Sequence, residues 1–197
     1  MYKRADLILS DVERLIRLVS DSVKPVQIII AGKAHPKDTE GKAVMSRIIN
    51  TIKDSRFLGR VVFVPNYEVS LARALVSGSD VWLNNPVPED EASGTSGMKA
   101  CANGSLHFTT NGGWAAEVDW SDKGFLLNSD YTANNLYDLL EQKIIPLYFA
   151  RDSDNIPTAW ISYMKQSIAA VCAEFSSKRT LKDYFNNLYT AALHKQH

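Results

Sequence analysis

The stretch from residue 80 to residue 109 decides the fold, and it reads DVWLNNPVPEDEASGTSGMKACANGSLHFT. The apolar runs at residues 80–84 and 105–109 each have the length of a short strand, and turn-forming residues bound them. Between the two runs, a glycine-rich turn leads into Met98, where the first turns of a helix are predicted. A strand, a helix and a second strand in this order predict a β-α-β unit, whose strands run parallel.

The same alternation of strand and helix extends along the chain toward the N-terminus, and one more strand follows. The sequence predicts further strands at residues 26–31, 60–64 and 124–127, and helices at residues 5–21, 39–54 and 70–77. Parallel strands must be covered on both faces. The pattern therefore predicts an α/β fold with a Rossmann-like, doubly wound parallel sheet.

From residue 131 onward the pattern is helical. It predicts helices at residues 132–149, where Pro146 interrupts the pattern, and at residues 157–175 and 178–194. We expect residues 1–150 to form the sheet domain. Residues 151–197 are expected to form a C-terminal helical segment that packs on it.

Composition excludes several classes of function. The 197 residues suit one hydrophobic core, and 22 basic side chains balance 22 acidic ones, so no net charge attracts nucleic acid. No apolar run approaches the roughly 20 residues that span a bilayer. Because no signal-peptide pattern is present either, we expect a cytoplasmic protein that binds neither nucleic acid nor a membrane. Cys101 and Cys172 have no neighbours at metal-ligand spacing, so no metal site is predicted.

Residues 91–99, EASGTSGMK, combine a carboxylate, two glycines, three hydroxyls and an amine. A turn that leads from a strand into a helix offers free backbone N–H groups and the positive end of the helix dipole, which favours an anionic or hydroxyl-rich ligand. Ligands of doubly wound sheets gather at the carboxyl ends of the strands. The turns at residues 32–35 and 65–67 also follow predicted strands, so the three turns predict one shared cleft.

The segments VWLNNP, EASGTSGMK and ANGSLHFTTNGGWAAEV resemble the α-glucan phosphorylases, which act on glycogen, starch or maltodextrin, and the short bacterial type in particular. Supporting matches lie at residues 2–5, 31–34, 65–67 and 144–148. The resemblance implies the C-terminal half of a two-domain GT-B glycosyltransferase. It implies transfer of glucose between an α-glucan end and inorganic phosphate, forming glucose-1-phosphate, with pyridoxal phosphate held on a lysine. An N-terminal phosphorylase half would be a partner, and the oligomeric state stays open, a homo-oligomer included.

For the cofactor, the resemblance implies that Lys99 is the lysine that carries pyridoxal phosphate. A reactive lysine must be partly deprotonated, and burial beside the positive end of a helix would lower its pKa in this direction. Thr95, Ser96 and Gly97 would bind the cofactor phosphate, and Tyr67 would lie along the pyridine ring. Ordinary turn and N-cap chemistry is the alternative for the first three, and a half-buried loop position is the alternative for Tyr67.

For the sugar, the resemblance implies that Glu91, Ser93 and Gly94 contact glucose hydroxyls. A carboxylate accepts two hydroxyls in fixed directions, and a glycine allows close approach of the backbone. The neighbouring acids Glu89 and Asp90 are interpreted as solvated loop residues.

For the substrate phosphate, the resemblance places Lys3 and Arg4 in a basic segment near the two phosphates, with Lys3 catalytic. A disordered basic N-terminus is an equally supported alternative. Lys33 and His35 lie on another turn of the cleft, where either phosphate contact or a plain surface loop fits. Glu68 stands where the long members have an arginine, which favours the short bacterial type.

Two alternatives remain at this point. One is a sugar-nucleotide-dependent retaining glucosyltransferase, which would not need Lys99 as a cofactor lysine. The other is a catalytically dead carbohydrate-binding or assembly fragment. Since the chain begins inside the basic motif and lacks the first half of the implied architecture, we expect it to be inactive alone.

Overall fold

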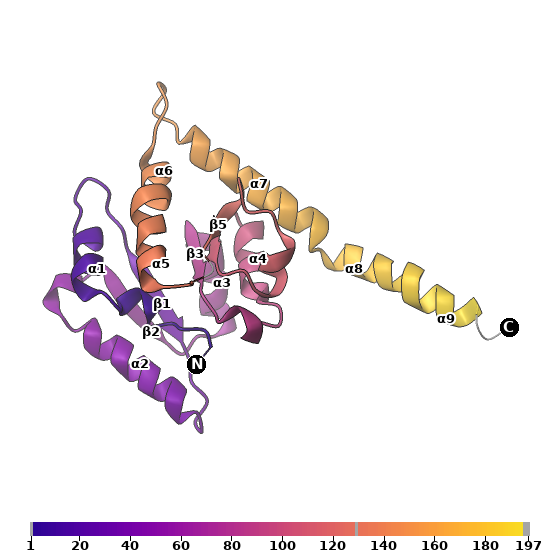
Figure 1. The fold of residues 1–197 in the computed structure, drawn as a ribbon, viewed down its shortest axis with the longest axis horizontal. Coiled ribbons are helices and arrows are strands. Elements are labelled where there is room, and N and C mark those ends of the chain that lie inside the picture. The colour runs from indigo at the N-terminus through magenta and orange to yellow at the C-terminus, as the bar shows by residue number, and fades with distance from the viewer. Residues whose placement is uncertain (1, 129, 195–197) are drawn as a thin grey trace.

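The computed structural model describes residues 2–128 and 130–194, and it has the α/β architecture that the sequence predicts (Figure 1). All pairings among its strands are parallel. The strands are β1 (Ile28–Gly32), β2 (Val61–Pro65), β3 (Val81–Asn84), β4 (Leu106–Thr109) and β5 (Gly124–Leu126). The prediction of a parallel α/β fold is confirmed.

Hydrogen bonding divides these strands into a pair, β1-β2, and a trio in the order β3-β4-β5. In the pair Ile28 lies opposite Val61, and in the trio Trp82 lies opposite His107. One hydrophobic core serves both sheets, because side chains from the pair and from the trio belong to a single buried cluster. Side-chain packing therefore joins the two sheets.

Helices follow the strands as the alternation predicts. Their bounds are α1 (Val12–Val19), α2 (Thr39–Thr51), α3 (Val69–Gly78) and α4 (Thr95–Ala102), with 3₁₀ turns η1 (Leu7–Leu9), η2 (Ser55–Phe57), η3 (Pro88–Asp90) and η4 (Gly113–Glu117). The single helix expected over residues 5–21 is divided into η1 and α1. Asp11 causes the division, because its side chain accepts a hydrogen bond from the Arg14 backbone N–H (2.9 Å) and so caps a new helix.

The C-terminal part is helical, as expected. Its elements are α5 (Ala133–Leu139), the π-helical turn η5 (Leu140–Ile144), α6 (Ile145–Phe149), α7 (Thr158–Glu174), α8 (Ser177–Tyr184), the π-helical turn η6 (Phe185–Tyr189) and α9 (Thr190–His194). The chain stays helical through Pro146, where an interruption was expected. The wider turn η5 ends at Ile144, two positions before this proline, whose nitrogen has no hydrogen to donate.

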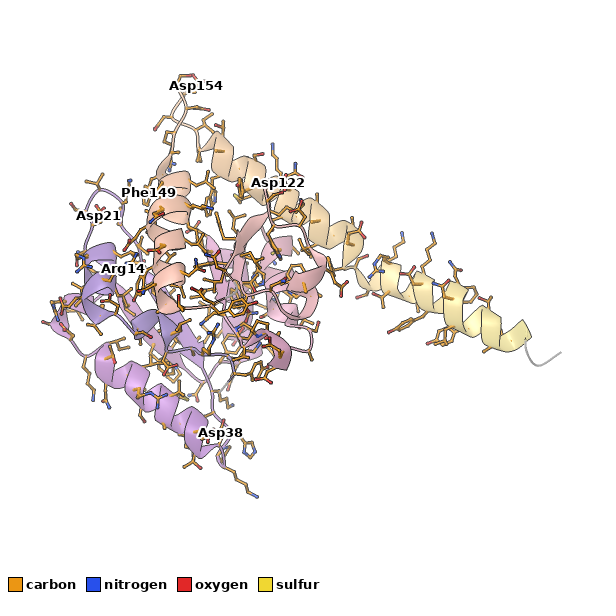
Figure 2. All side chains as sticks on the ribbon, viewed as in Figure 1. Arg14, Asp21, Asp38, Asp122, Phe149 and Asp154 are labelled. Carbon is orange, nitrogen blue, oxygen red and sulfur yellow. The ribbon has the colours of Figure 1, made fainter. Side chains whose placement is uncertain are left out.

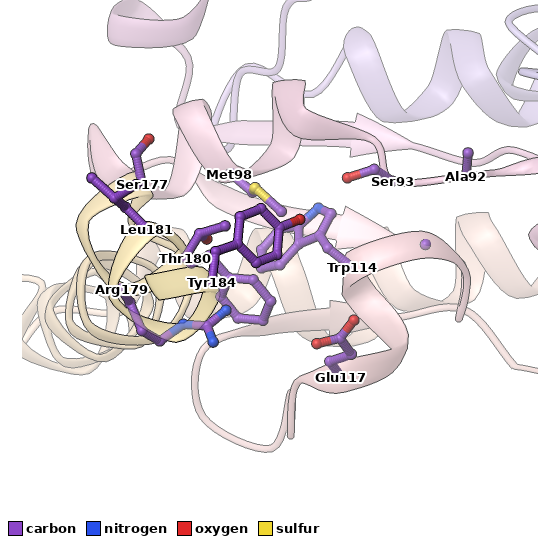
Figure 3. A pocket seen from close by; sticks show the side chains of 12 residues that line it. Ala92, Ser93, Met98, Trp114, Glu117, Ser177, Arg179, Thr180, Leu181 and Tyr184 are labelled. Carbon is purple, nitrogen blue, oxygen red and sulfur yellow. The ribbon is translucent and has the colours of Figure 1, made fainter. Parts of the chain in front are cut away.

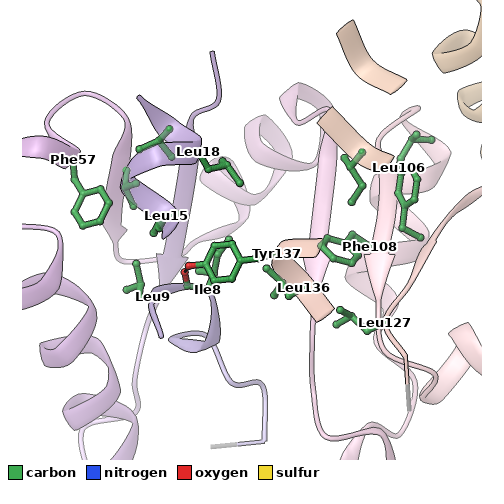
Figure 4. Close-up of a cluster of buried hydrophobic side chains, with 14 of the residues drawn as sticks. Ile8, Leu9, Leu15, Leu18, Phe57, Leu106, Phe108, Leu127, Leu136 and Tyr137 are labelled. Atoms are coloured by element: carbon green, nitrogen blue, oxygen red, sulfur yellow. Dashed lines mark hydrogen bonds between the residues drawn. The ribbon is translucent and has the colours of Figure 1, made fainter. Parts of the chain in front are cut away.

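The main core lies where α1 and α5 meet the strands (Figure 4). Tyr137 of α5 is fully buried, and its hydroxyl donates to the backbone carbonyls of Ile8 and Asp11. The Arg14 guanidinium binds the carboxylates of Asp138 and Glu141. Figure 2 labels Arg14 among the side chains on this part of the fold. These contacts fasten the N-terminal segment to α5.

The last helices behave differently from one another. α7 packs against α4 and β4, and its Trp160 and Val171 are buried. α8 and α9 extend away from the rest of the molecule (Figure 1), and their large apolar side chains are exposed. The division into two parts at residue 150 stays a prediction. Among the described residues, no helix is both long enough and apolar enough to cross a membrane.

Candidate functional site

The turn between β3 and α4 depends on glycine at its last position. Gly94 is the N-cap residue of α4, and its φ of 80° lies in the left-handed region that favours glycine. A Cβ atom at Gly94 would also lie 3.2 Å from Glu91 Oε1. The absence of a side chain thus allows both the backbone conformation and the close approach of the carboxylate.

The start of α4 has free hydrogen-bond donors. The Gly97 N–H donates to the Gly94 carbonyl at 3.2 Å, and no side chain caps the helix. Within residues 2–128 and 130–194, the N–H groups of Thr95 and Ser96 donate to no protein acceptor. These two groups and the helix dipole make the turn suitable for an anion.

Glu91 is the buried acid of the site. Its side chain is 5% exposed and forms an ion pair with the Lys3 ammonium, whose side chain is 45% exposed. η3 precedes it directly, and the Glu91 N–H donates to the Pro88 carbonyl at 3.2 Å. Glu89 and Asp90 are exposed, as expected for solvated loop residues.

The N-terminal basic segment is ordered by contacts to its backbone and to Arg4. The Tyr2 carbonyl accepts a hydrogen bond from the Val87 N–H at 2.8 Å. The Arg4 guanidinium donates to the carbonyls of Asn85 (2.8 Å), Tyr131 (2.9 Å) and Pro86 (3.3 Å). Burial lowers the pKa of Arg4, and the charge of Tyr131 opposes this shift. Of the basic pair, Arg4 therefore supports the backbone, while Lys3 reaches Glu91.

Lys99 lies in the last turn of α4, because the helix begins at Thr95 and not near Met98. Its side chain is exposed, so the expectation that Lys99 is buried beside the positive end of the helix is wrong in this chain. Lys99 and Thr95 are four residues apart and therefore lie on one face of the helix, with Cβ atoms about 5–6 Å apart. A ligand could thus contact the free N–H groups and the amine together.

The remaining predicted residues follow the other sheet. Lys33 and His35 are exposed after β1, and Tyr67 is half-buried after β2, next to Asn66 with its φ of 55°. Gly32 and Pro65 are register partners, so both turns lie at one edge of that sheet. Within the described part of the chain, no hydrogen bond or ion pair joins Lys33, His35 or Tyr67 to Glu91.

A pocket of about 530 Å³ opens beside the turn (Figure 3). The turn contributes Ser93, whose carbonyl accepts a hydrogen bond from the Trp114 N–H at 3.0 Å. The opposite wall comes from α8, with Arg179 and Tyr184. No local sequence pattern marks Trp114, Glu117, Arg179 or Tyr184 as residues of this site. The α8 residues lie more than 80 positions from the turn, so no local pattern connects them with it.

His107 is a further residue of the site that the sequence does not predict. It lies on β4, fully buried, and its ring stacks on Trp114 with 5.4 Å between centroids. Burial lowers the pKa of His107 to about 3; a backbone interaction with Trp82 opposes the shift, and the charge of Lys3 adds to it. Within the described residues, neither ring nitrogen has a hydrogen-bond partner of normal geometry. The imidazole is therefore neutral at physiological pH.

The fold and this site together define an α/β protein in which, within the described residues, a helix start with two free N–H groups adjoins a buried carboxylate. A comparison with protein families identifies the group to which it belongs. The model of the family described as Carbohydrate phosphorylase matches residues 1–123, and the chain belongs to this family.

Individual relatives agree with the family match. The chain is 48% identical to the glycogen phosphorylase of Aquifex aeolicus over 203 aligned residues, which cover 99% of this chain and 29% of that protein. It is 39% identical to the maltodextrin phosphorylase of Thermococcus litoralis, covering 98% of this chain and 24% of that protein. The chain thus spans less than a third of the length of these relatives.

A solved structure shares the fold. The crystal structure of a glycosyltransferase from Rickettsia africae superimposes with a TM-score of 0.70 at 17% identity, covering 94% of this chain and 44% of that one. At this identity the likeness concerns the fold alone.

Proposed function

We propose that the chain is the C-terminal part of an α-1,4-glucan phosphorylase, which releases glucose-1-phosphate from the ends of glycogen or maltodextrin with pyridoxal phosphate as cofactor. One observation carries the proposal. The buried Glu91, paired with Lys3, lies beside a helix start with two free N–H groups and a lysine on the adjoining turn. A site for a hydroxylated sugar thus adjoins a site for an anion.

The residues present fit pyridoxal phosphate. The free N–H groups of Thr95 and Ser96 and the two hydroxyls suit its phosphate, and Gly97 completes the proposed phosphate-binding turn. The Lys99 amine, one helical turn further on, suits its aldehyde. When bound, the cofactor supplies a phosphate group that takes part in the acid–base chemistry. Tyr67 is proposed to lie along its ring.

The chain's own residues have separate roles in this proposal. Glu91 accepts hydrogen bonds from glucose hydroxyls, and the left-handed turn at Gly94 lets the sugar approach the backbone of Ser93. Lys3 leaves Glu91 and binds the substrate phosphate, whose negative charge it stabilises. Because Lys3 is already fixed near the carboxylate, the charge lies close to where it is needed before the substrate arrives.

Activity is proposed for the longer protein and not for this part alone. Lys99 and Lys3 are exposed to solvent here, and charge stabilisation is weak in water. The rest of the longer protein, an N-terminal half by the family resemblance, would exclude water from the cleft. Robust phosphorolysis by the 197-residue chain alone would contradict this division of roles.

Trapping of the cofactor tests the proposal directly. The full-length protein is incubated with pyridoxal phosphate and reduced with borohydride, and the labelled peptide is mapped. Label is expected at Lys99, and Lys99→Arg should abolish both the label and the release of glucose-1-phosphate. Lys178→Arg is the matched control, because this exposed lysine of α8 lies outside the proposed site. Label on another lysine, or activity that survives Lys99→Arg, would contradict the assignment of Lys99. A full-length protein with neither label nor phosphorolysis would favour a sugar-nucleotide-dependent enzyme or a binding module.

A further inference from the structure

The first turn of α4 rests directly on the ring of His107. Gly97 is buried in that turn, and a Cβ atom added to it would lie 2.4 Å from His107 Cε1 and 2.6 Å from Nε2. Real Cβ atoms essentially never approach other atoms this closely. Gly97 is therefore a glycine for reasons of space, whereas Gly94 has a left-handed backbone.

The ring of His107 has no room to move away. It is fully buried, stacks on Trp114, and lies 5.4 Å from the ring of Trp120 at an angle of 51°. Trp114 and Trp120 also contact each other, with centroids 5.3 Å apart. The two indoles thus hold the imidazole in place. Within the described part of the chain, neither of its nitrogens has a hydrogen-bond partner of normal geometry, and its one polar neighbour of note is the backbone of Trp82.

An ordinary core position would not explain this residue. A buried polar atom without a partner lowers stability, and an apolar side chain on β4 would avoid that cost. The imidazole provides a flat, immobile ring against which the backbone of Gly97 packs. The turn that it supports is the one whose Thr95 and Ser96 N–H groups are free.

We propose that His107 is a positioning residue: through its contact with Gly97 it sets the place of the first turn of α4, and so aligns the free N–H groups with Lys99. The link to cofactor binding rests on the proposed function. The contact between His107 and Gly97 does not.

A set of four variants tests the contact. Gly97→Ala adds the clashing methyl group, His107→Ala removes the support, and the double variant Gly97→Ala/His107→Ala has room for the methyl group. Gly78→Ala is the control, because no atom lies within 4 Å of a Cβ at Gly78 in α3. Alanine is the better helix former, so without the contact Gly97→Ala should stabilise α4.

The first readout is hydrogen exchange in residues 95–102, and the second is the amount of borohydride-trapped pyridoxal phosphate at Lys99 in the full-length protein. In Gly97→Ala we expect exchange to rise about tenfold or more and trapping to fall by a similar factor. In the double variant both should return to within about threefold of His107→Ala. Gly78→Ala should match the wild type.

The outcomes test the contact between His107 and Gly97 separately from the proposed cofactor site at Lys99. If Gly97→Ala is as protected as the wild type, or if the double variant is no better than Gly97→Ala, the positioning role is wrong. If Gly97→Ala does not fold, the double variant decides: a folded double variant supports the contact, and an unfolded one overturns it. If no protein, wild type included, is trapped at Lys99 while exchange follows the expected order, the contact stands and the proposed cofactor site fails.

Discussion

Acid should destabilise this protein through His107 in particular. Burial lowers its pKa from an ordinary value of 6.5 to about 3. The folded state therefore keeps the imidazole neutral at a pH where the unfolded chain binds a proton. Since the unfolded state binds more protons between these two values, the free energy of unfolding falls as the pH falls through 6.5 toward 3. Above pH 6.5 the imidazole is neutral in both the folded and the unfolded state, so His107 causes no such loss of stability there.

The magnitude follows from the width of that window. A pH of about 5 lies about 1.5 units below the pKa of the unfolded histidine. Each unit corresponds to about 1.4 kcal/mol, so the free energy of unfolding should fall by about 2 kcal/mol. Urea unfolding at about pH 7.5 and about pH 5 measures it; with a slope near 2 kcal/mol per molar urea, the midpoint should shift by about 1 M.

A non-titrating variant isolates this contribution. The altered packing in His107→Leu changes its stability at neutral pH, so the comparison uses only the change on acidification. His107→Leu should lack the extra loss of about 2 kcal/mol in free energy of unfolding. The carboxylates that also titrate in this range are the same in both proteins, so they cancel in the comparison. Equal losses in the wild type and in His107→Leu would refute the reasoning, because they would show that the folded state admits a charged imidazole.

Two further predictions concern the ion pair. Lys3→Met leaves the buried Glu91 carboxylate without its partner and should lower the free energy of unfolding by about 2 kcal/mol, or the melting temperature by about 4–8 °C, as measured by calorimetry. Adding Glu91→Gln to this variant should restore most of the lost stability. An unchanged melting temperature in Lys3→Met would contradict the pairing. In the full-length protein, Glu91→Ala should lower kcat/KM for glucose-1-phosphate by about one to two decades without unfolding the protein. Unchanged kinetics would exclude Glu91 as a sugar contact and move attention to Glu89 or Asp90.

Much of the fold could be predicted because its strands are short apolar runs between turn-forming residues. The runs at residues 80–84 and 105–109 correspond to β3 and β4 within one residue at either end. The helix over residues 5–21 was predicted too long, since apolar periodicity continues through Asp11 while the side-chain cap ends one element and starts another. Periodicity reports the buried face of a segment, and capping reports its ends.

The site could be predicted only in part. The turn EASGTSGMK was identified from its composition, but the start of α4 was placed too late, because the left-handed Gly94 already begins the helix at Thr95. This error made Lys99 a first-turn residue. The pairing of Lys3 with Glu91 joins positions 88 apart, and no local pattern predicts such a contact. His107 reads as one polar residue in an apolar strand, and only the depth of its burial shows its importance.

The contacts of Arg4 bear on how this part of the protein tolerates sequence change. Its guanidinium binds the backbone carbonyls of residues 85, 86 and 131 and no side chain of theirs. Every amino acid has a carbonyl, so substitutions at Pro86 or Tyr131 that keep the backbone path preserve these hydrogen bonds. A change of Arg4 itself removes all three at once, and lysine, with a single nitrogen, cannot replace them. Among related sequences, position 4 should therefore vary far less than the positions that it contacts.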